Sequence, residues 1–204
     1  VDGIFGPTET LIICDNTANK EFVVSDLMAQ AEHDILALPM LITNDLEFAK
    51  DINNLYMNKL SNLSRKDIIS KSMDRGFISV LNEIDEMIEV CNNIAAEHTT
   101  IASEKLIEIS KKITSSGSLF LGEISSEVLA DYVAGPSHVM PTNGSARYSS
   151  SLSTRTFTKS IPVLSINKDE FEKICSDGEL LASLESLDAH RNALSVRKKY
   201  FIGD

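Results

Sequence analysis

Short apolar runs that favour β-strands recur through the first part of the chain. They stand at 10–14 (TLIIC), 38–43 (LPMLIT), 77–81, 99–102 and 118–121. The first run ends at the turn-forming pair Asp15-Asn16, as expected where a buried strand reaches the surface. These runs therefore predict five short strands.

Between the strands, apolar residues recur at spacings of three and four, which is typical of amphipathic helices. The helical segments are 20–32, 46–60, 64–73, 83–93 and 104–113, with Asn44 and Ser64 placed as N-caps of the second and third. Strands and helices that alternate at these lengths favour βαβ units. The sequence predicts an α/β fold, with a mostly parallel sheet covered by helices on both faces, resembling an incomplete Rossmann fold.

The pattern changes after residue 130. Residues 131–153 are rich in Gly, Pro and Ser and predict a long loop, and loops of that length are usually functional or disordered. Beyond it, 161–166 reads as a strand and 169–197 as one or two helices. The sequence thus predicts an α/β domain at 1–153 and a small, mainly helical tail domain at 154–204, too small to bury its apolar face alone.

Composition narrows the class of protein. With 19 Lys and Arg against 30 Asp and Glu, the net charge is −11, so nucleic acid and anionic membranes are poor partners. The three cysteines lack metal-site spacing, which favours reduced thiols in the cytoplasm. No apolar run approaches the roughly 20 residues of a membrane helix. A secretory signal is absent, although a chain that begins with Val leaves an organelle signal open.

All four histidines stand in polar or small-residue surroundings, at positions 33, 98, 138 and 190. Gln30 and His33 are three apart, so on a helix they would share a face. Glu97 and His98 are adjacent, and such a pair is a natural acid–base unit. Taken singly, a solvated helix end or an exposed loop explains each pattern more simply, because scattered ligands have no recognisable spacing.

In combination, these strings resemble the second half of histidinol dehydrogenase. The resemblance rests on GPTE at 6–9, QAEHD at 30–34, EH at 97–98, FLG at 120–122, DYVAGP at 131–136 with His138 and PT at 141–142, and LDAH at 187–190. It covers essentially the whole chain. Members of that family are about twice as long, so we expect this chain to be a C-terminal part, without the N-terminal half that holds the nicotinamide.

The resemblance implies a role for each of the polar positions. The zinc ligands fall on Gln30, His33, Asp131 and His190, and the catalytic pair on Glu97 and His98. Further substrate contacts fall on Thr8, His138 and Glu185, and the ligands and the catalytic pair also touch substrate. Thr8 stands where the family commonly has Ser and keeps the hydroxyl.

The activity that the resemblance implies is a zinc-dependent, four-electron oxidation of L-histidinol to L-histidine through the aldehyde, with two NAD⁺. We expect a cytoplasmic homodimer with shared active sites, in which the tail bearing Glu185 and His190 reaches the partner's site. Two alternatives stay open: a related zinc dehydrogenase of another amino alcohol or diol, and a catalytically silent metal-binding fragment. We expect the isolated fragment to be inactive.

Overall fold

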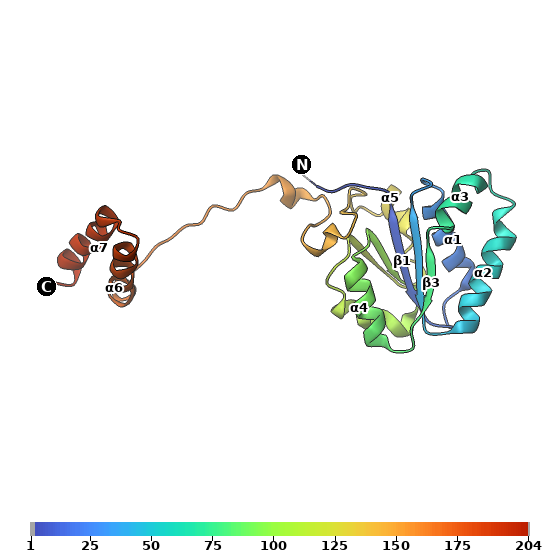
Figure 1. Ribbon diagram of the computed structural model, residues 1–204, viewed down its shortest axis with the longest axis horizontal. Coiled ribbons are helices and arrows are strands. Elements are labelled where there is room, and N and C mark those ends of the chain that lie inside the picture. Colours follow the sequence, from blue (N-terminus) through green and yellow to red (C-terminus); the bar gives the residue numbers. More distant parts are fainter. Residues whose placement is uncertain (1–2, 204) are drawn as a thin grey trace. The chain divides into compact units, whose positions relative to one another are not determined.

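The computed structural model describes residues 3–203 and contains one five-stranded sheet (Figure 1). Its strands are β1 (Glu9–Cys14), β2 (Leu38–Thr43), β3 (Phe77–Val80), β4 (His98–Ile101) and β5 (Ser118–Leu121). The order across the sheet is β3-β2-β1-β4-β5, and all four neighbouring pairs are parallel. The predicted α/β class and parallel sheet are therefore confirmed.

Helices return the chain from the end of each of the first four strands to the start of the next. They are α1 (Lys20–Ala31), α2 (Leu46–Leu60), α3 (Lys66–Met73), α4 (Ile84–Ile94) and the 3₁₀ helix η1 (Glu104–Lys112), and a short helix α5 (Glu127–Tyr132) follows β5. Each of the two predicted N-caps is wrong by one residue. Asp45, not Asn44, caps α2 by accepting the Phe48 N–H, and Arg65 precedes α3 without a side-chain cap. A carboxylate beside a helix N-terminus also gains from the helix dipole.

The two central strands β1 and β2 are buried on both faces, which explains their nearly continuous apolar runs. Ile12 and Leu41 pack with α1 and α2 on one face, and Leu11 and Met40 pack with α4 and η1 on the other. Figure 1 shows α1, α2 and α3 on one side of the sheet and α4 on the other. Helices packed on both faces of the sheet therefore hold β1 in place.

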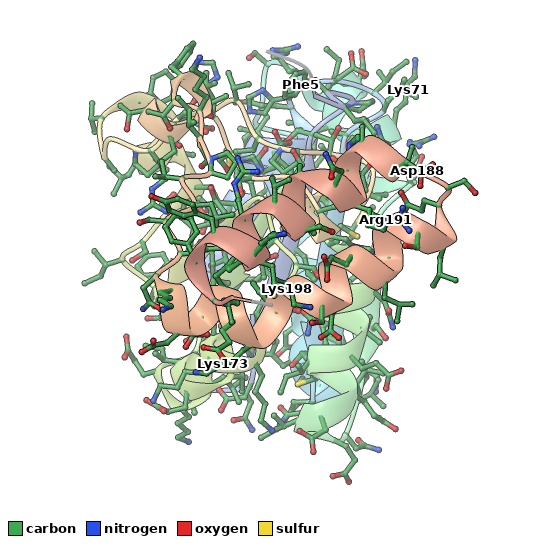
Figure 2. The ribbon with its side chains drawn as sticks, turned by 90° about the vertical axis from the view of Figure 1, so that its left-hand side faces the viewer. Phe5, Lys71, Lys173, Asp188, Arg191 and Lys198 are labelled. Atoms are coloured by element: carbon green, nitrogen blue, oxygen red, sulfur yellow. The ribbon has the colours of Figure 1, made fainter. Side chains whose placement is uncertain are left out.

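The chain divides into two compact units between Thr158 and Lys159. The second unit is a pair of helices, α6 (Lys168–Leu184) and α7 (Asp188–Phe201), with short 3₁₀ helices, η2 (Ser145–Arg147) and η3 (Thr154–Phe157), in the preceding loop. Lys198, which is labelled on α7 in Figure 2, has its Nζ 3.1 Å from Oε2 of Glu179 in α6. None of the described helices is long and apolar enough to cross a membrane.

The strand predicted at 161–166 is wrong, because the described residues there form no strand. Ile161, Val163 and Leu164 are 69%, 89% and 84% exposed. A β-prone sequence becomes a strand only when another strand pairs with it, and these residues have no such neighbour in the part of the chain that is described.

Candidate functional site at the amino ends of the strands

Glu97 and His98 lie where α4 gives way to β4. The helix ends at Ala95, whose left-handed conformation (φ 53°, ψ 51°) turns the chain sharply. Three residues later His98 begins β4, paired with Thr10 of β1. Both side chains are nearly buried, with 8% of Glu97 and 3% of His98 exposed. Glu97 and His98 therefore lie at the amino edge of the sheet, where β4 runs beside the central strand β1.

The backbone of Glu9 holds both members of this pair. Its N–H donates to Oε2 of Glu97 at 3.3 Å, and its carbonyl oxygen lies 3.4 Å from Nδ1 of His98. Glu9 is the first residue of β1, so the sheet itself sets the orientation of the catalytic candidates.

The other ring nitrogen of His98 faces a carboxylate. Nε2 lies 3.8 Å from Oδ1 of Asp131, beyond hydrogen-bonding distance, and it is buried with no hydrogen-bond partner among the described residues. Asp131 belongs to α5, so the prediction that a loop begins there is wrong. A six-residue helix is too short to give a periodic signal, and sequence reasoning missed it.

Gln30 and His33 are brought to the same edge by the end of α1. Gln30 is only 2% exposed, and its Oε1 accepts the Thr8 hydroxyl at 3.0 Å. The helix ends at Ala31, so the two residues do not share a helix face as predicted. His33 follows in a turn, where its N–H donates to the Gln30 carbonyl at 3.2 Å.

The charges of these groups act on one another. Burial raises the pKa of Glu97, although His98 opposes the shift. Burial alone would lower the pKa of His98, but Asp131, Glu127 and Glu97 together raise it. The His98 ring, with smaller effects from His33 and His138, lowers the pKa of Asp131. An ionised Asp131 beside a basic imidazole follows from this balance.

The segment around Thr142 and Asn143 is anchored at the same edge. The Gly6 N–H donates to Oγ1 of Thr142 at 2.6 Å, and the Asn143 N–H donates to Oε1 of Glu9 at 3.1 Å. Burial raises the pKa of the Glu9 carboxyl despite this bond. Sequence reasoning missed Glu9, although its place within the Gly6–Glu9 string could have pointed to it.

Glu185 and His190 belong to the second unit. Glu185 ends α6 and His190 lies in the first turns of α7. Both line one hollow between the two helices, together with apolar residues such as Leu181 and Leu194.

The donors at the amino edge suit a zinc ion by their chemistry. Gln30 offers a buried amide oxygen, His33 an imidazole nitrogen and Asp131 a carboxylate held ionised, and zinc accepts such nitrogen and oxygen ligands. No group of three or more His, Cys, Asp and Glu side chains suited to a metal occurs among residues 3–203. The first unit would contribute only two residues of those types, with Gln30 as the third ligand.

The candidate residues lie at the edge of the sheet opposite to the one that ligands usually occupy. In open α/β sheets, ligand crevices usually lie at the carboxyl ends of the strands. Here the carboxyl edge holds Asp15, whose Oδ1 is already taken by Thr17 and Ser103. The candidate residues instead precede β1 and β4 or end the helix that runs back to the amino edge.

Comparisons with known proteins agree on one family. The family model for histidinol dehydrogenase matches residues 1–198. The histidinol dehydrogenase of Dehalococcoides mccartyi is 41% identical over 97% of this chain and 45% of its own length. That of Thermus thermophilus is 35% identical over 97% of this chain and 48% of its own. The crystal structure of histidinol dehydrogenase from Elizabethkingia anophelis superposes with a TM-score of 0.89 at 39% identity, over 98% of this chain and 46% of that one. The chain therefore spans about half the length of these relatives.

Proposed function

The chain belongs to the histidinol dehydrogenase family, and on that premise we propose that it forms part of an enzyme that oxidises L-histidinol to L-histidine through the aldehyde. The observation that carries the proposal is the buried Nε2 of His98, free of hydrogen bonds within the described residues and facing Asp131 at 3.8 Å. A basic nitrogen held in that way is prepared to take a proton from a bound alcohol.

His98 acts in the first oxidation as the general base. Its Nδ1–H is held by the Glu9 carbonyl, which leaves the lone pair of Nε2 for the substrate hydroxyl. As the hydroxyl proton moves to Nε2, the carbon loses a hydride and becomes an aldehyde. NAD⁺ supplies the hydride acceptor, at a site that we place in the part of the relatives that this chain does not span.

Glu97 acts in the second oxidation. Burial raises the pKa of its carboxyl, which brings it closer to the neutral range where a carboxylate exchanges protons well. It would take a proton from the water that adds to the aldehyde. The resulting hydrate would pass the second hydride to a second NAD⁺ and release a hydroxyl proton, which gives the carboxyl group of histidine.

Gln30, His33 and Asp131 are the proposed zinc ligands of the first unit. Zinc would orient the substrate through its nitrogen atoms and act as a Lewis acid at the site. Thr8 positions the Gln30 amide through its hydroxyl, and His138 and Thr8 contact substrate. Because Gln30 and Asp131 come from different helices, the ion would also fix α1 against α5.

Glu185 and His190 complete a site of a partner subunit in this proposal. The helix pair that carries them exposes an apolar face, with Leu180, Leu181 and Leu184 being 59%, 61% and 73% exposed. A pair of helices this small needs another surface to cover such a face. On this proposal the complete protein is a homodimer with shared sites in the cytoplasm, and the chain alone would not turn over.

The test is NADH formation by the complete enzyme supplied with histidinol, NAD⁺ and zinc. We expect His33→Ala to abolish activity and to weaken zinc binding, because a ligand is lost. The matched control is Glu32→Ala, which removes an exposed carboxylate from the same short segment and should leave both unchanged. A complete enzyme that oxidises other amino alcohols or diols but not histidinol would contradict the proposal.

A further inference from the structure

A second carboxyl group lies behind the catalytic pair and has no part in the chemistry described so far. Glu127 begins α5 and is only 1% exposed. One of its oxygens, Oε2, is buried with no hydrogen-bond partner among the described residues. Leaving a carboxyl in such a place costs free energy, so its retention calls for a reason.

The other oxygen of Glu127 ties α5 to the two strands that carry the site. Oε1 accepts the Thr10 hydroxyl of β1 at 2.5 Å and the Thr100 hydroxyl of β4 at 2.9 Å. Thr10 is the ladder partner of His98. Thr100 follows His98 by two residues, so the two side chains lie on the same face of the strand. Glu127 is therefore hydrogen-bonded to β1 and β4 on the face of the sheet that carries the His98 side chain.

Asp131 stands one helical turn further along α5. Residues four apart project from the same side of a helix, so Glu127 and Asp131 both face the sheet. A helix of six residues is not stable by itself, and its pose depends on its tertiary anchors. Glu127 is one such anchor. The Ser126 hydroxyl is a second, because it donates a hydrogen bond to Asp26 at 3.1 Å.

We propose that Glu127 is a positioning residue: by accepting both threonine hydroxyls it fixes α5 on β1 and β4, and so sets the Asp131 carboxylate against His98 and in place to hold zinc. The inference rests on the proposed function, because it takes Asp131 as a zinc ligand. It assigns Glu127 no contact with substrate.

The role of Glu127 needs its shape and its acceptor oxygen, and it does not need the charge. Burial raises the pKa of its carboxyl, and Oε1 accepts both hydroxyls in the charged and in the neutral form alike. A Gln side chain has nearly the same shape and an acceptor oxygen. If geometry is what matters, Glu127→Gln should keep the function and Glu127→Ala should lose it.

The experiment measures the zinc dissociation constant of the complete enzyme by competition with a chromophoric chelator. We expect Glu127→Ala to weaken zinc binding about 10- to 100-fold, as is usual for groups that orient a metal ligand, and Glu127→Gln to stay within about threefold of wild type. If Glu127→Ala binds zinc as wild type does, or if Glu127→Gln is as damaged as Glu127→Ala, the inference is overturned.

A matched pair of threonines covers the case in which Glu127→Ala does not fold. Thr100→Val removes one donor to Glu127 without changing shape, and we expect zinc binding about 2- to 10-fold weaker. Thr99→Val, one residue earlier, removes a hydroxyl that bonds Ser116 on the opposite face and should leave zinc binding within about twofold of wild type. Equal effects of the two substitutions on zinc binding would overturn the inference.

The same measurements distinguish the inference from the proposed function. If the wild-type enzyme binds no zinc, the proposed function is overturned as well. If the wild-type enzyme binds zinc and the variants bind it equally well, only the positioning role of Glu127 is overturned.

Discussion

The Nδ1 atom of His98 lies 3.4 Å from the backbone carbonyl oxygen of Glu9. A carbonyl oxygen only accepts, so the neutral ring must carry its proton on Nδ1. Nε2 then keeps its lone pair and faces Asp131. One backbone group at the start of β1 thus decides which nitrogen of the base is available.

The first prediction separates the two oxidations. Glu97→Gln keeps an oxygen that can accept the Glu9 N–H, but a carboxamide cannot take a proton from water. In the complete enzyme we expect the aldehyde-to-acid step to slow about 10²- to 10⁴-fold, and the alcohol step far less. Rates measured separately with histidinol and with histidinal provide the check. Equal slowing of both steps would contradict the division of roles.

A companion substitution probes the other member of the pair. His98→Asn retains an N–H that can reach the Glu9 carbonyl but removes Nε2. We expect oxidation of histidinol to fall about 10²- to 10⁴-fold while the thermal unfolding midpoint stays near that of wild type. An alcohol step that survives in a folded His98→Asn enzyme would show that another group is the base.

Shared sites predict complementation between two inactive variants. Mixing subunits that carry His33→Ala with subunits that carry His190→Ala gives hybrid dimers in which one site holds both lesions and the other holds none. With free exchange, about a quarter of wild-type activity should return, since half of the dimers are hybrids with one working site. No recovery despite proven exchange would rule out a site built from two subunits.

The buried thiols should resist modification. Burial raises the pKa of Cys14 to about 12 and that of Cys91 to about 11, and both side chains are fully buried. The thiolate is the reactive form, so an alkylating reagent at pH 8 should leave both unlabelled until denaturant is added. Peptide mass spectrometry reads the labelling of each cysteine. Rapid labelling of Cys14 in the native protein would contradict its place in the core.

Asp15 predicts a pH-dependent contribution to stability. Burial alone would raise the pKa of its carboxyl, but hydrogen bonds from Thr17 and Ser103 hold it below the usual range. A lowered folded pKa stabilises the fold above the unfolded value of about 3.9 and loses that effect as pH falls through the folded value. Asp15→Asn should therefore cost about 1–2 kcal/mol at pH 7 and at pH 5, with the cost shrinking below about pH 3.9. Urea unfolding of both proteins across this range is the measurement.

The strands were predictable from the sequence because β1 and β2 are buried on both faces and so must be apolar throughout. The strand predicted at 161–166 failed for the opposite reason, since β propensity without a pairing strand leaves those residues extended and exposed. Burial in a sheet is thus a stronger constraint on sequence than intrinsic preference.

The placement of part of the candidate site could be predicted from the sequence. Glu97 lies between a helix and a strand, as the predicted bounds of those elements indicate, and His98 is the first residue of β4. The short α5 that carries Asp131, and the burial of Glu127 behind it, left no periodic pattern to detect. Thr8 immediately precedes β1 and His98 begins β4, so the predicted starts of these two strands already indicated that both residues lie at the amino edge.

Because the candidate groups lie at the amino edge, the loops at the two edges of the sheet should differ in how well they tolerate insertions. Turns that follow β2 and β3, at 44–45 and 81–83, contain none of the proposed ligand, catalytic or substrate residues. Insertions, affinity tags or fluorescent labels placed in those turns would leave the reacting groups undisturbed. A single added residue before β1 or β4 would instead displace a catalytic side chain by the length of one strand residue, about 3.3 Å.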